Sequence, residues 1–220
     1  MGKKSLFTKE QKEILAGLSQ SSYIRENFYL TGGTALAEFY LHHRYSDDLD
    51  FFSTKKFENQ VILTLMSDLS REYQFNFQSR SIETVYLFNL TYKNKRQLKI
   101  DFAYYPYPQI EEGANYSGIK IDSLHDIAIN KLLTVNQRTN VKDFVDLYFL
   151  LQKQFTIWDL MYGVEEKFKM KTELLLLAQD LLKVESFDFL PRMITPLNLG
   201  DLQKFFRKSA KKIGGQAVER

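Results

Sequence analysis

The sequence predicts an α+β fold, in which an N-terminal mixed sheet with flanking helices is followed by a C-terminal helical bundle lobe. The first half of the chain mixes helical and strand-like hydrophobic patterns. Residues 105–118 then bring two prolines and two glycines into a stretch without clear periodicity, and the pattern beyond it is helical to the end. In a chain of 220 residues we therefore expect one lobe over residues 1–112 and a second over residues 113–220.

The individual elements follow from the spacing of apolar residues, because recurrence every three or four positions predicts helices and strict alternation predicts strands. Ser123 and Asp126 have the spacing of a capping box and predict the start of the first helix in the second lobe. In chain order, the first lobe should contain helix 9–19, strand 27–30, helix 34–43, strand 49–52, helix 58–73 and strands 75–80, 84–92 and 97–104. The second lobe should contain helices 124–137, 141–153, 158–169, 172–184 and 199–213.

Composition excludes several classes of function. The chain has no cysteine, so disulfides, thiolate zinc sites and a cysteine nucleophile are impossible. The longest unbroken apolar run, residues 174–178, is far below the roughly 18 residues that span a bilayer. Residues 1–13 are too polar for a signal peptide. We therefore expect a cytoplasmic protein with no membrane partner.

The net charge of +3 is concentrated at the C-terminus. Residues 203–220 carry six basic side chains against the single acid Glu219, a local net charge of +5 that leaves the first 202 residues at −2. Two interpretations stay open for this basic tail. It can contact a phosphate backbone, or its cations can simply accompany the last turns of a terminal helix, where the helix dipole favours positive charge.

A Gly-Gly turn follows the first predicted strand. Gly32 and Gly33 lack a Cβ, so the backbone can turn sharply there and approach a ligand closely. The helix that follows directs its first amides at whatever lies above the turn, an arrangement that suits phosphate. By itself such a turn is weak evidence, because it is more often only a turn.

Three aspartates strengthen the case for a phosphate-handling site. Asp48 and Asp50 are two residues apart on one strand and face the same side, and paired carboxylates suit Mg²⁺. Asp101 is the single acid of the strand over residues 97–104. If the two strands are neighbours, the three carboxylates converge as a two-metal phosphoryl or nucleotidyl transfer site requires. The alternative is an edge strand with solvated aspartates.

In the second lobe, Lys131 falls in the middle of an apolar helical stripe. Either its ammonium reaches into a cleft to contact a triphosphate, or its stem is buried with the charge at the rim. Asp143 and Asp146 share one face of the next helix and can orient Lys131 or bind substrate. The three histidines have no zinc-binding spacing, and neither a G-x-S-x-G motif nor a P-loop is present.

Together these residues resemble the nucleotidyltransferase superfamily, whose signature is a hydrophobic residue, Gly-Gly or Gly-Ser, a helix, and Asp-hydrophobic-Asp-hydrophobic. Within it, the segment GGTALAEFYLHHRYSDDLDFF looks like the AbiEii/AbiGii-type toxins of abortive-infection and toxin–antitoxin systems. The later segments IDSLHDIAINKLL and VKDFVDLYFLL resemble the Lys-bearing and Asp-bearing motifs of that family. The likeness covers about residues 25–152 and implies a nucleotidyltransferase-like fold for the first lobe.

The resemblance also implies roles for individual residues. It makes Asp48, Asp50 and Asp101 metal ligands and catalytic carboxylates, and Lys131 a catalytic residue that contacts the nucleotide phosphates. The cofactor would be Mg²⁺, as two ions, or Mn²⁺. The expected nucleotide-binding residues are Gly32, Gly33, Thr34, Arg44, Ser46, Lys131 and Asp143. Lys142 replaces the arginine that is frequent before Asp143, and 14 residues separate Gly33 from Asp48, slightly more than is common in the superfamily.

The leading hypothesis is an enzyme that transfers a nucleoside monophosphate (NMP) from an NTP to an acceptor hydroxyl and releases pyrophosphate. The resemblance makes RNA, notably the tRNA acceptor end, a plausible acceptor and a cognate antitoxin protein a plausible partner. Alternatives are the same fold modifying a protein or small-molecule hydroxyl, an inactive nucleotide- or partner-binding module, and a glycosyltransferase that uses Asp-x-Asp. The last is disfavoured because no long parallel βαβ series precedes Asp48.

Overall fold

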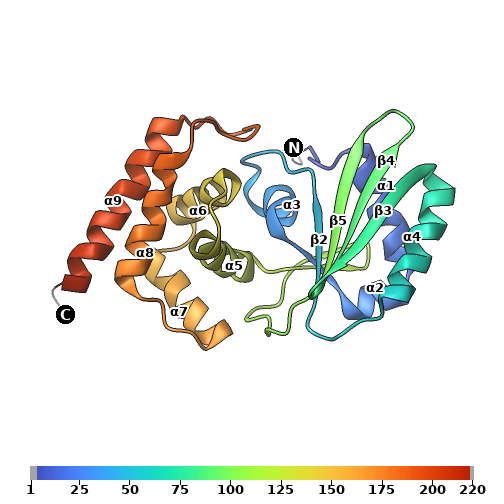
Figure 1. The fold of residues 1–220 in the computed structure, drawn as a ribbon, viewed down its shortest axis with the longest axis horizontal. Helices are drawn as coiled ribbons and strands as arrows, with labels where there is room; N and C mark the ends of the chain where they lie inside the picture. Colours follow the sequence, from blue (N-terminus) through green and yellow to red (C-terminus); the bar gives the residue numbers. More distant parts are fainter. Residues whose placement is uncertain (1–3, 219–220) are drawn as a thin grey trace. The chain divides into compact units, whose positions relative to one another are not determined.

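A computed structural model describes residues 4–218 (Figure 1). Within these residues the chain divides into two compact units. The first contains residues 4–40, 46–108 and 112–123, and the second contains residues 41–45, 109–111 and 124–218. The units therefore interleave along the chain, whereas the sequence analysis expected one boundary after residue 112. Residues 112–123 belong with the first unit because they carry strands that extend its sheet.

The described part of the first unit is built on a seven-stranded sheet with the order β3-β4-β5-β2-β1-β7-β6. β2 is antiparallel to β1 and parallel to β5, and β7 is parallel to β1. The mixed sheet and its flanking helices confirm the predicted α+β class. The strands are β1 (Tyr29–Thr31), β2 (Leu49–Ser53), β3 (Phe75–Ile82), β4 (Val85–Tyr92), β5 (Gln97–Tyr104), β6 (Asn115–Tyr116) and β7 (Ile119–Ile121).

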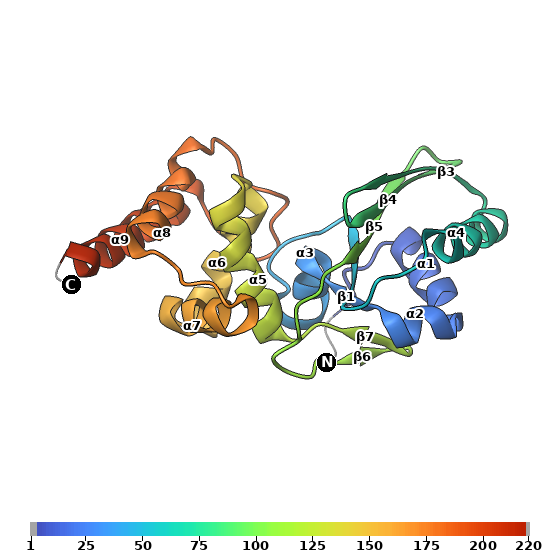
Figure 2. The same ribbon diagram turned by 60° about the horizontal axis from the view of Figure 1, so that its bottom comes forward.

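Helices cover the two faces of this sheet unequally. α1, α2 and α4 lie on one face, and α3 lies near β1 and β2 on the other (Figures 1 and 2). Alternation along the strands directs Phe51, Phe88 and Phe102 to the core, where all three are fully buried and each stabilises the fold by about 1.5–3 kcal/mol. The helical elements are α1 (Lys9–Gln20), α2 (Ser22–Asn27), α3 (Gly32–Ala35), the π-helical turn η1 (Leu36–Leu41) and α4 (Asn59–Tyr73).

The second unit is helical, as the sequence predicts. Helices α5 and α6 have the expected bounds. Phe144 of α6 and Phe206 of α9 pack edge to face with ring centroids 5.1 Å apart, and both are fully buried. The elements are α5 (Leu124–Gln137), α6 (Val141–Lys153), α7 (Ile157–Phe168), α8 (Leu174–Leu181), the 3-10 turn η2 (Leu182–Ser186) and α9 (Leu199–Val218). None of the helices in the described chain is both long and apolar enough to cross a membrane.

Candidate active site

The turn after β1 depends on a glycine. Gly32 has a φ of 73°, in the left-handed region that side chains of L-residues rarely adopt. A Cβ placed on Gly32 would also lie 2.2 Å from Oδ2 of Asp50, far inside van der Waals contact. Glycine is therefore required for two independent reasons, the backbone conformation and the space that the Asp50 carboxylate occupies.

The strand register places two of the predicted carboxylates side by side. β2 and β5 are adjacent parallel strands, and Asp50 is paired with Asp101 across them. Both residues alternate with buried core residues, so they share the face opposite the core. Asp48 lies two residues before Asp50, and the Thr34 hydroxyl donates a hydrogen bond to its backbone carbonyl. The adjacency on which the sequence argument depended is thus present.

Asp101 has one paired and one unpaired oxygen. Its Oδ2 accepts a hydrogen bond from Lys99 Nζ at 2.5 Å, whereas Oδ1 is buried without a hydrogen-bond partner among the described residues. Burial raises the pKa of Asp101, and the neighbouring Lys99 ammonium opposes that rise. The nearby negative charge of Asp48 raises the pKa of Asp101 further, because like charges disfavour ionisation.

These residues fit a hard cation. A buried acceptor without a donor is costly unless a proton or a cation compensates it, and carboxylate oxygens are the ligands that Mg²⁺ prefers. Within residues 4–218, no group of three or more acidic or histidine side chains forms a ready-made metal cage. The metal-binding roles of Asp48, Asp50 and Asp101 therefore stay predictions, supported by the unpaired Oδ1 and by the close approach of Gly32 to Asp50.

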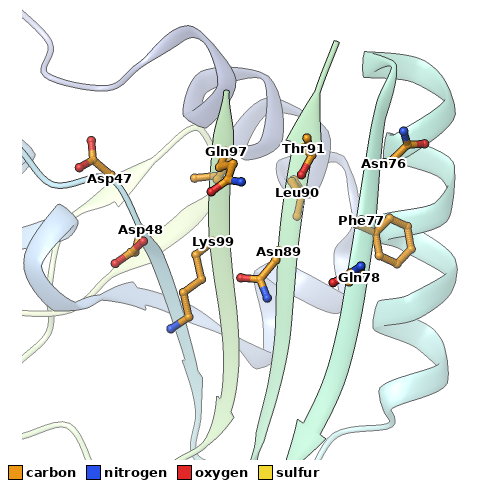
Figure 3. Close-up of a pocket in the computed structure, with 11 residues that line it drawn as sticks. Asp47, Asp48, Asn76, Phe77, Gln78, Asn89, Leu90, Thr91, Gln97 and Lys99 are labelled. Atoms are coloured by element: carbon orange, nitrogen blue, oxygen red, sulfur yellow. The ribbon is translucent and has the colours of Figure 1, made fainter. Parts of the chain in front are cut away.

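A polar pocket of about 990 Å³ opens beside this carboxylate group. Figure 3 shows that its polar side chains project from β3, β4 and β5, with Asp47 and Asp48 on the segment that leads into β2. The lining residues are Asp47, Asp48, Asn76, Phe77, Gln78, Asn89, Leu90, Thr91, Gln97, Leu98 and Lys99.

The second unit holds the other predicted residues in a buried ion-pair network. Lys131 Nζ lies 2.7 Å from Asp143 Oδ1 and 2.7 Å from Asp146 Oδ2. Arg44 donates from Nε and Nη2 to the two oxygens of Asp146, at 2.6 and 2.7 Å. His43 Nε2 is 2.7 Å from Asp146 Oδ1. All five side chains are buried, so the network ties residues 43–44 to helices α5 and α6.

Charge pairing fixes the ionisation of this network. Burial alone would raise the pKa of Asp146, but the positive charges of Arg44 and Lys131 hold it well below its usual range. Burial would likewise lower the pKa of Lys131, and the carboxylates of Asp146 and Asp143 raise it instead. These two carboxylates and the lysine are therefore ionised near neutral pH.

This geometry bears on four expected nucleotide-binding residues. The Lys131 ammonium is buried and paired with Asp143 and Asp146, the two acids that the sequence placed where they could orient it. Phosphate contacts by Lys131, Arg44 or Asp143 stay predictions, and they require these groups to exchange internal partners for the ligand. Ser46 lies in the first unit, where its carbonyl accepts a hydrogen bond from Gln11 Nε2 at 3.1 Å.

Sequence reasoning missed the part that several polar side chains play in these clusters. Lys99 could have been identified, because strand alternation places it on the face of Asp101. His43 gave no local signal, because its partner Asp146 is 103 residues away. Ser123 and Asp126 marked the start of α5, which begins at Leu124. The sequence did not indicate the other partners of Asp126: its carboxylate accepts from the backbone amides of Ile110 and Glu111 and forms a fully buried ion pair with Lys167 at 2.6 Å.

Known proteins provide an independent comparison. The sequence model of a family described as nucleotidyl transferase AbiEii toxin, type IV toxin–antitoxin system, matches residues 13–216. An uncharacterized protein of Aquifex aeolicus (strain VF5) is 39% identical over 156 residues, which cover 69% of this chain and 69% of that relative.

Two solved structures share the fold. MenT4, a nucleotidyltransferase toxin from Mycobacterium tuberculosis, superimposes with a TM-score of 0.59 and 16% identity, covering 93% of this chain and 82% of MenT4. JHP933 from Helicobacter pylori gives 0.56 and 20% identity, covering 97% of this chain and 95% of JHP933. At these identities the two structures establish similarity of fold alone.

Proposed function

Because the chain belongs to the AbiEii nucleotidyltransferase toxin family, we propose that it uses Mg²⁺ to transfer an NMP from an NTP to a hydroxyl of RNA, such as a tRNA acceptor end. The product of this reaction would block the RNA end, and a cognate antitoxin would counteract the effect. Nucleotides and tRNA are both plentiful in the cytoplasm, where we place the reaction.

The observation that carries the proposal is the grouping of Asp48, Asp50 and Asp101 next to the Gly32 turn. Asp50 and Asp101 are register partners on adjacent strands, Asp48 is two residues from Asp50, and Gly32 leaves room beside the Asp50 carboxylate. Carboxylates grouped in this way are what metal-assisted nucleotidyl transfer needs.

In this proposal Asp48 and Asp50 would hold two Mg²⁺ ions, or Mn²⁺, with Asp101 as a further ligand. The bound ions would neutralise the negative charge on the phosphate oxygens. Asp101 accepts the proton of the attacking hydroxyl, as a carboxylate next to the reacting groups can do. The acceptor oxygen forms a bond to the α-phosphorus, the bond from that phosphorus to the bridging oxygen breaks, and pyrophosphate leaves with the electron pair.

The proposal is tested by incubating the protein with Mg²⁺, each of four α-labelled NTPs, and total bacterial RNA and protein. We expect labelled RNA from the wild type and a loss of at least 100-fold in the double variant Asp48→Asn/Asp50→Asn. Asp68→Asn is the matched control, because Asp68 is exposed on α4 and lies away from the carboxylate face. It should transfer label as the wild type does.

Other outcomes separate the alternatives. Labelled protein that is lost in the double variant would move the acceptor to a side-chain hydroxyl. Nucleotide binding without any transfer, despite added RNA, protein and small-molecule acceptors, would contradict the enzyme proposal and favour a binding module. RNA labelling that persists in the double variant would contradict a catalytic role for Asp48 and Asp50.

A further inference from the structure

The open face of strands β3, β4 and β5 carries an unusual set of side chains, which we call the amide face and define as Asn76, Gln78, Asn89, Thr91 and Gln97. The strand register arranges them in two rows across the sheet. One row is Asn76, Thr91 and Gln97, and the other is Gln78 and Asn89, which is completed by Lys99. All five members of the amide face are exposed, and they line the 990 Å³ pocket.

This surface is continuous with the candidate active site. The next row of the same face contains Arg80, Leu87, Asp101 and Asp50, by the same register. Consecutive rows on one face are about 6.7 Å apart. A ligand on the amide face would therefore reach the carboxylates without crossing the sheet.

The composition of the amide face points to hydrogen-bond recognition. Asn is disfavoured in strands, and charged residues are common on exposed strand faces, yet four of the five positions are neutral amides. Each amide offers both donors and an acceptor, and within residues 4–218 none of the four uses its side chain in a hydrogen bond to the protein. These residues therefore act against the strand preference of the sequence and form no internal hydrogen bonds in return. Such a conflict between local preference and structure is expected at a functional surface.

Sheet order separates this surface from the predicted nucleotide cradle. Gly32 and Gly33 follow β1, on one side of β2, whereas the amide face lies beyond β5, on the other side. Substrates bound on these two sides of β2 would reach the carboxylates from opposite directions. In-line transfer requires this arrangement, because the attacking and leaving oxygens lie on opposite sides of the phosphorus. The amide face thus suits the acceptor better than the NTP.

We propose that the amide face binds the unpaired bases at the 3′ end of the acceptor RNA and directs the terminal hydroxyl toward Asp101. Asn and Gln side chains can form paired hydrogen bonds with base edges, and unpaired RNA exposes those edges. The five residues of the amide face carry no charge, and Lys99 beside them is already paired with Asp101 at 2.5 Å, so this surface favours bases over phosphates as its ligands. This inference rests on the proposed function for the identity of the RNA as acceptor.

The variant that tests it is Gln78→Ala/Asn89→Ala/Gln97→Ala. The matched control removes three exposed amides elsewhere, Gln60→Ala/Gln152→Ala/Gln154→Ala. A second variant, Gln78→Thr/Asn89→Thr/Gln97→Thr, keeps strand-favouring residues in case the alanine variant does not fold.

The first readout is the binding of a fluorescent single-stranded RNA hexamer. The assay uses 0.3 M salt, about three times the 0.1 M at which the Debye length is ~10 Å, because salt weakens contacts to the phosphate backbone of the RNA. We expect the amide-face variant to bind at least 10-fold more weakly than the wild type and the control. A hexamer without bases should bind the wild type and the variant equally weakly. Equal affinity of the wild type and the amide-face variant for the intact hexamer would overturn the proposal.

The second readout is NMP transfer. In the amide-face variant, the KM for acceptor RNA should be at least 10-fold higher than in the wild type, and the KM for NTP should be unchanged. A raised KM for NTP with an unchanged KM for RNA would overturn the inference and assign the face to the nucleotide. If the hexamer binds through the amide face but neither the wild type nor any variant transfers NMP, the proposed function is contradicted. The assignment of the amide face as an RNA-binding surface is then still supported.

Discussion

The close approach of Gly32 to Asp50 shows how one missing atom shapes the candidate site. The Asp50 carboxylate occupies the place where a side chain at residue 32 would begin, because the distance from that Cβ position to Asp50 Oδ2 is 2.2 Å. Residue 32 therefore positions Asp50 as well as turning the chain. A substitution there should therefore move the Asp50 carboxylate directly.

We predict that Gly32→Ala lowers NMP transfer at least 100-fold by displacing the Asp50 carboxylate. The positive φ should cost a further 1–2 kcal/mol, approximately, in the free energy of unfolding. Gly215→Ala is the matched control, because a Cβ there meets nothing within 4 Å and alanine favours a helix over glycine by about 1 kcal/mol. Initial rates of label transfer and urea unfolding measure both effects. Wild-type rates in Gly32→Ala would show that Asp50 is not positioned in this way.

At the scale of elements, the buried network joins the segment after η1 to helices α5 and α6. His43 and Arg44 contact Asp146, and Lys131 links Asp146 to Asp143. Each charge is desolvated, so the network is favourable only while every partner is present. Removing one carboxylate leaves buried cations without compensation.

We predict that Asp146→Asn lowers the free energy of unfolding at pH 7 by about 3–5 kcal/mol. The pKa of Asp146 is depressed in the folded state, so its contribution is complete above the unfolded pKa of 3.8 and is lost as the pH falls below that value. The difference between wild type and variant should therefore shrink on acidification by about 1.4 kcal/mol per pH unit below 3.8. Urea titrations at pH 7 and in this acid range measure it.

The control for this comparison is Asp68→Asn. Asp68 pairs with Arg71 at the surface, where a salt bridge contributes about 0–1 kcal/mol. A decrease in stability in Asp146→Asn as small as that in the control, or one that does not change with pH, would contradict a stabilising network.

Local patterns predicted most elements, and long-range pairing explains what they missed. Helices α5 and α6 have their expected bounds because their apolar stripes are regular. Strands β6 and β7 were missed because two or three residues give no periodicity, and β7 is a strand only through its pairing with β1 and β6. The same limit applies to the site. Asp48, Asp50 and Asp101 were marked by strand alternation, whereas the partnership of Asp146 with Arg44 spans 102 residues.

At the scale of the whole molecule, positive charge collects on one face of α9. The buried residues Leu202, Phe206, Ala210 and Ile213 form its inner stripe, and basic side chains including Lys208, Lys211 and Lys212 are exposed. Lys208, Lys211 and Lys212 precede the last described turn of α9, which contains no basic residue, and the helix dipole acts mainly within the last turn. Arg220, the final basic residue of the tail, lies outside the described residues.

We therefore predict that this basic face contributes to RNA binding by pairing with phosphates. The variant Lys208→Gln/Lys211→Gln/Lys212→Gln should weaken RNA binding at 50 mM salt and reduce the slope of log K against log salt by about 0.7–0.9 for each phosphate that the protein no longer neutralises. The control Lys153→Gln/Lys169→Gln/Lys171→Gln removes the same charge from other exposed positions. Binding titrations between 50 and 200 mM salt distinguish the two, because a general charge effect lowers affinity equally in both variants, whereas local phosphate pairing changes the slope only in the α9 variant. An unchanged slope in the α9 variant would assign these lysines to solvation of an amphipathic helix.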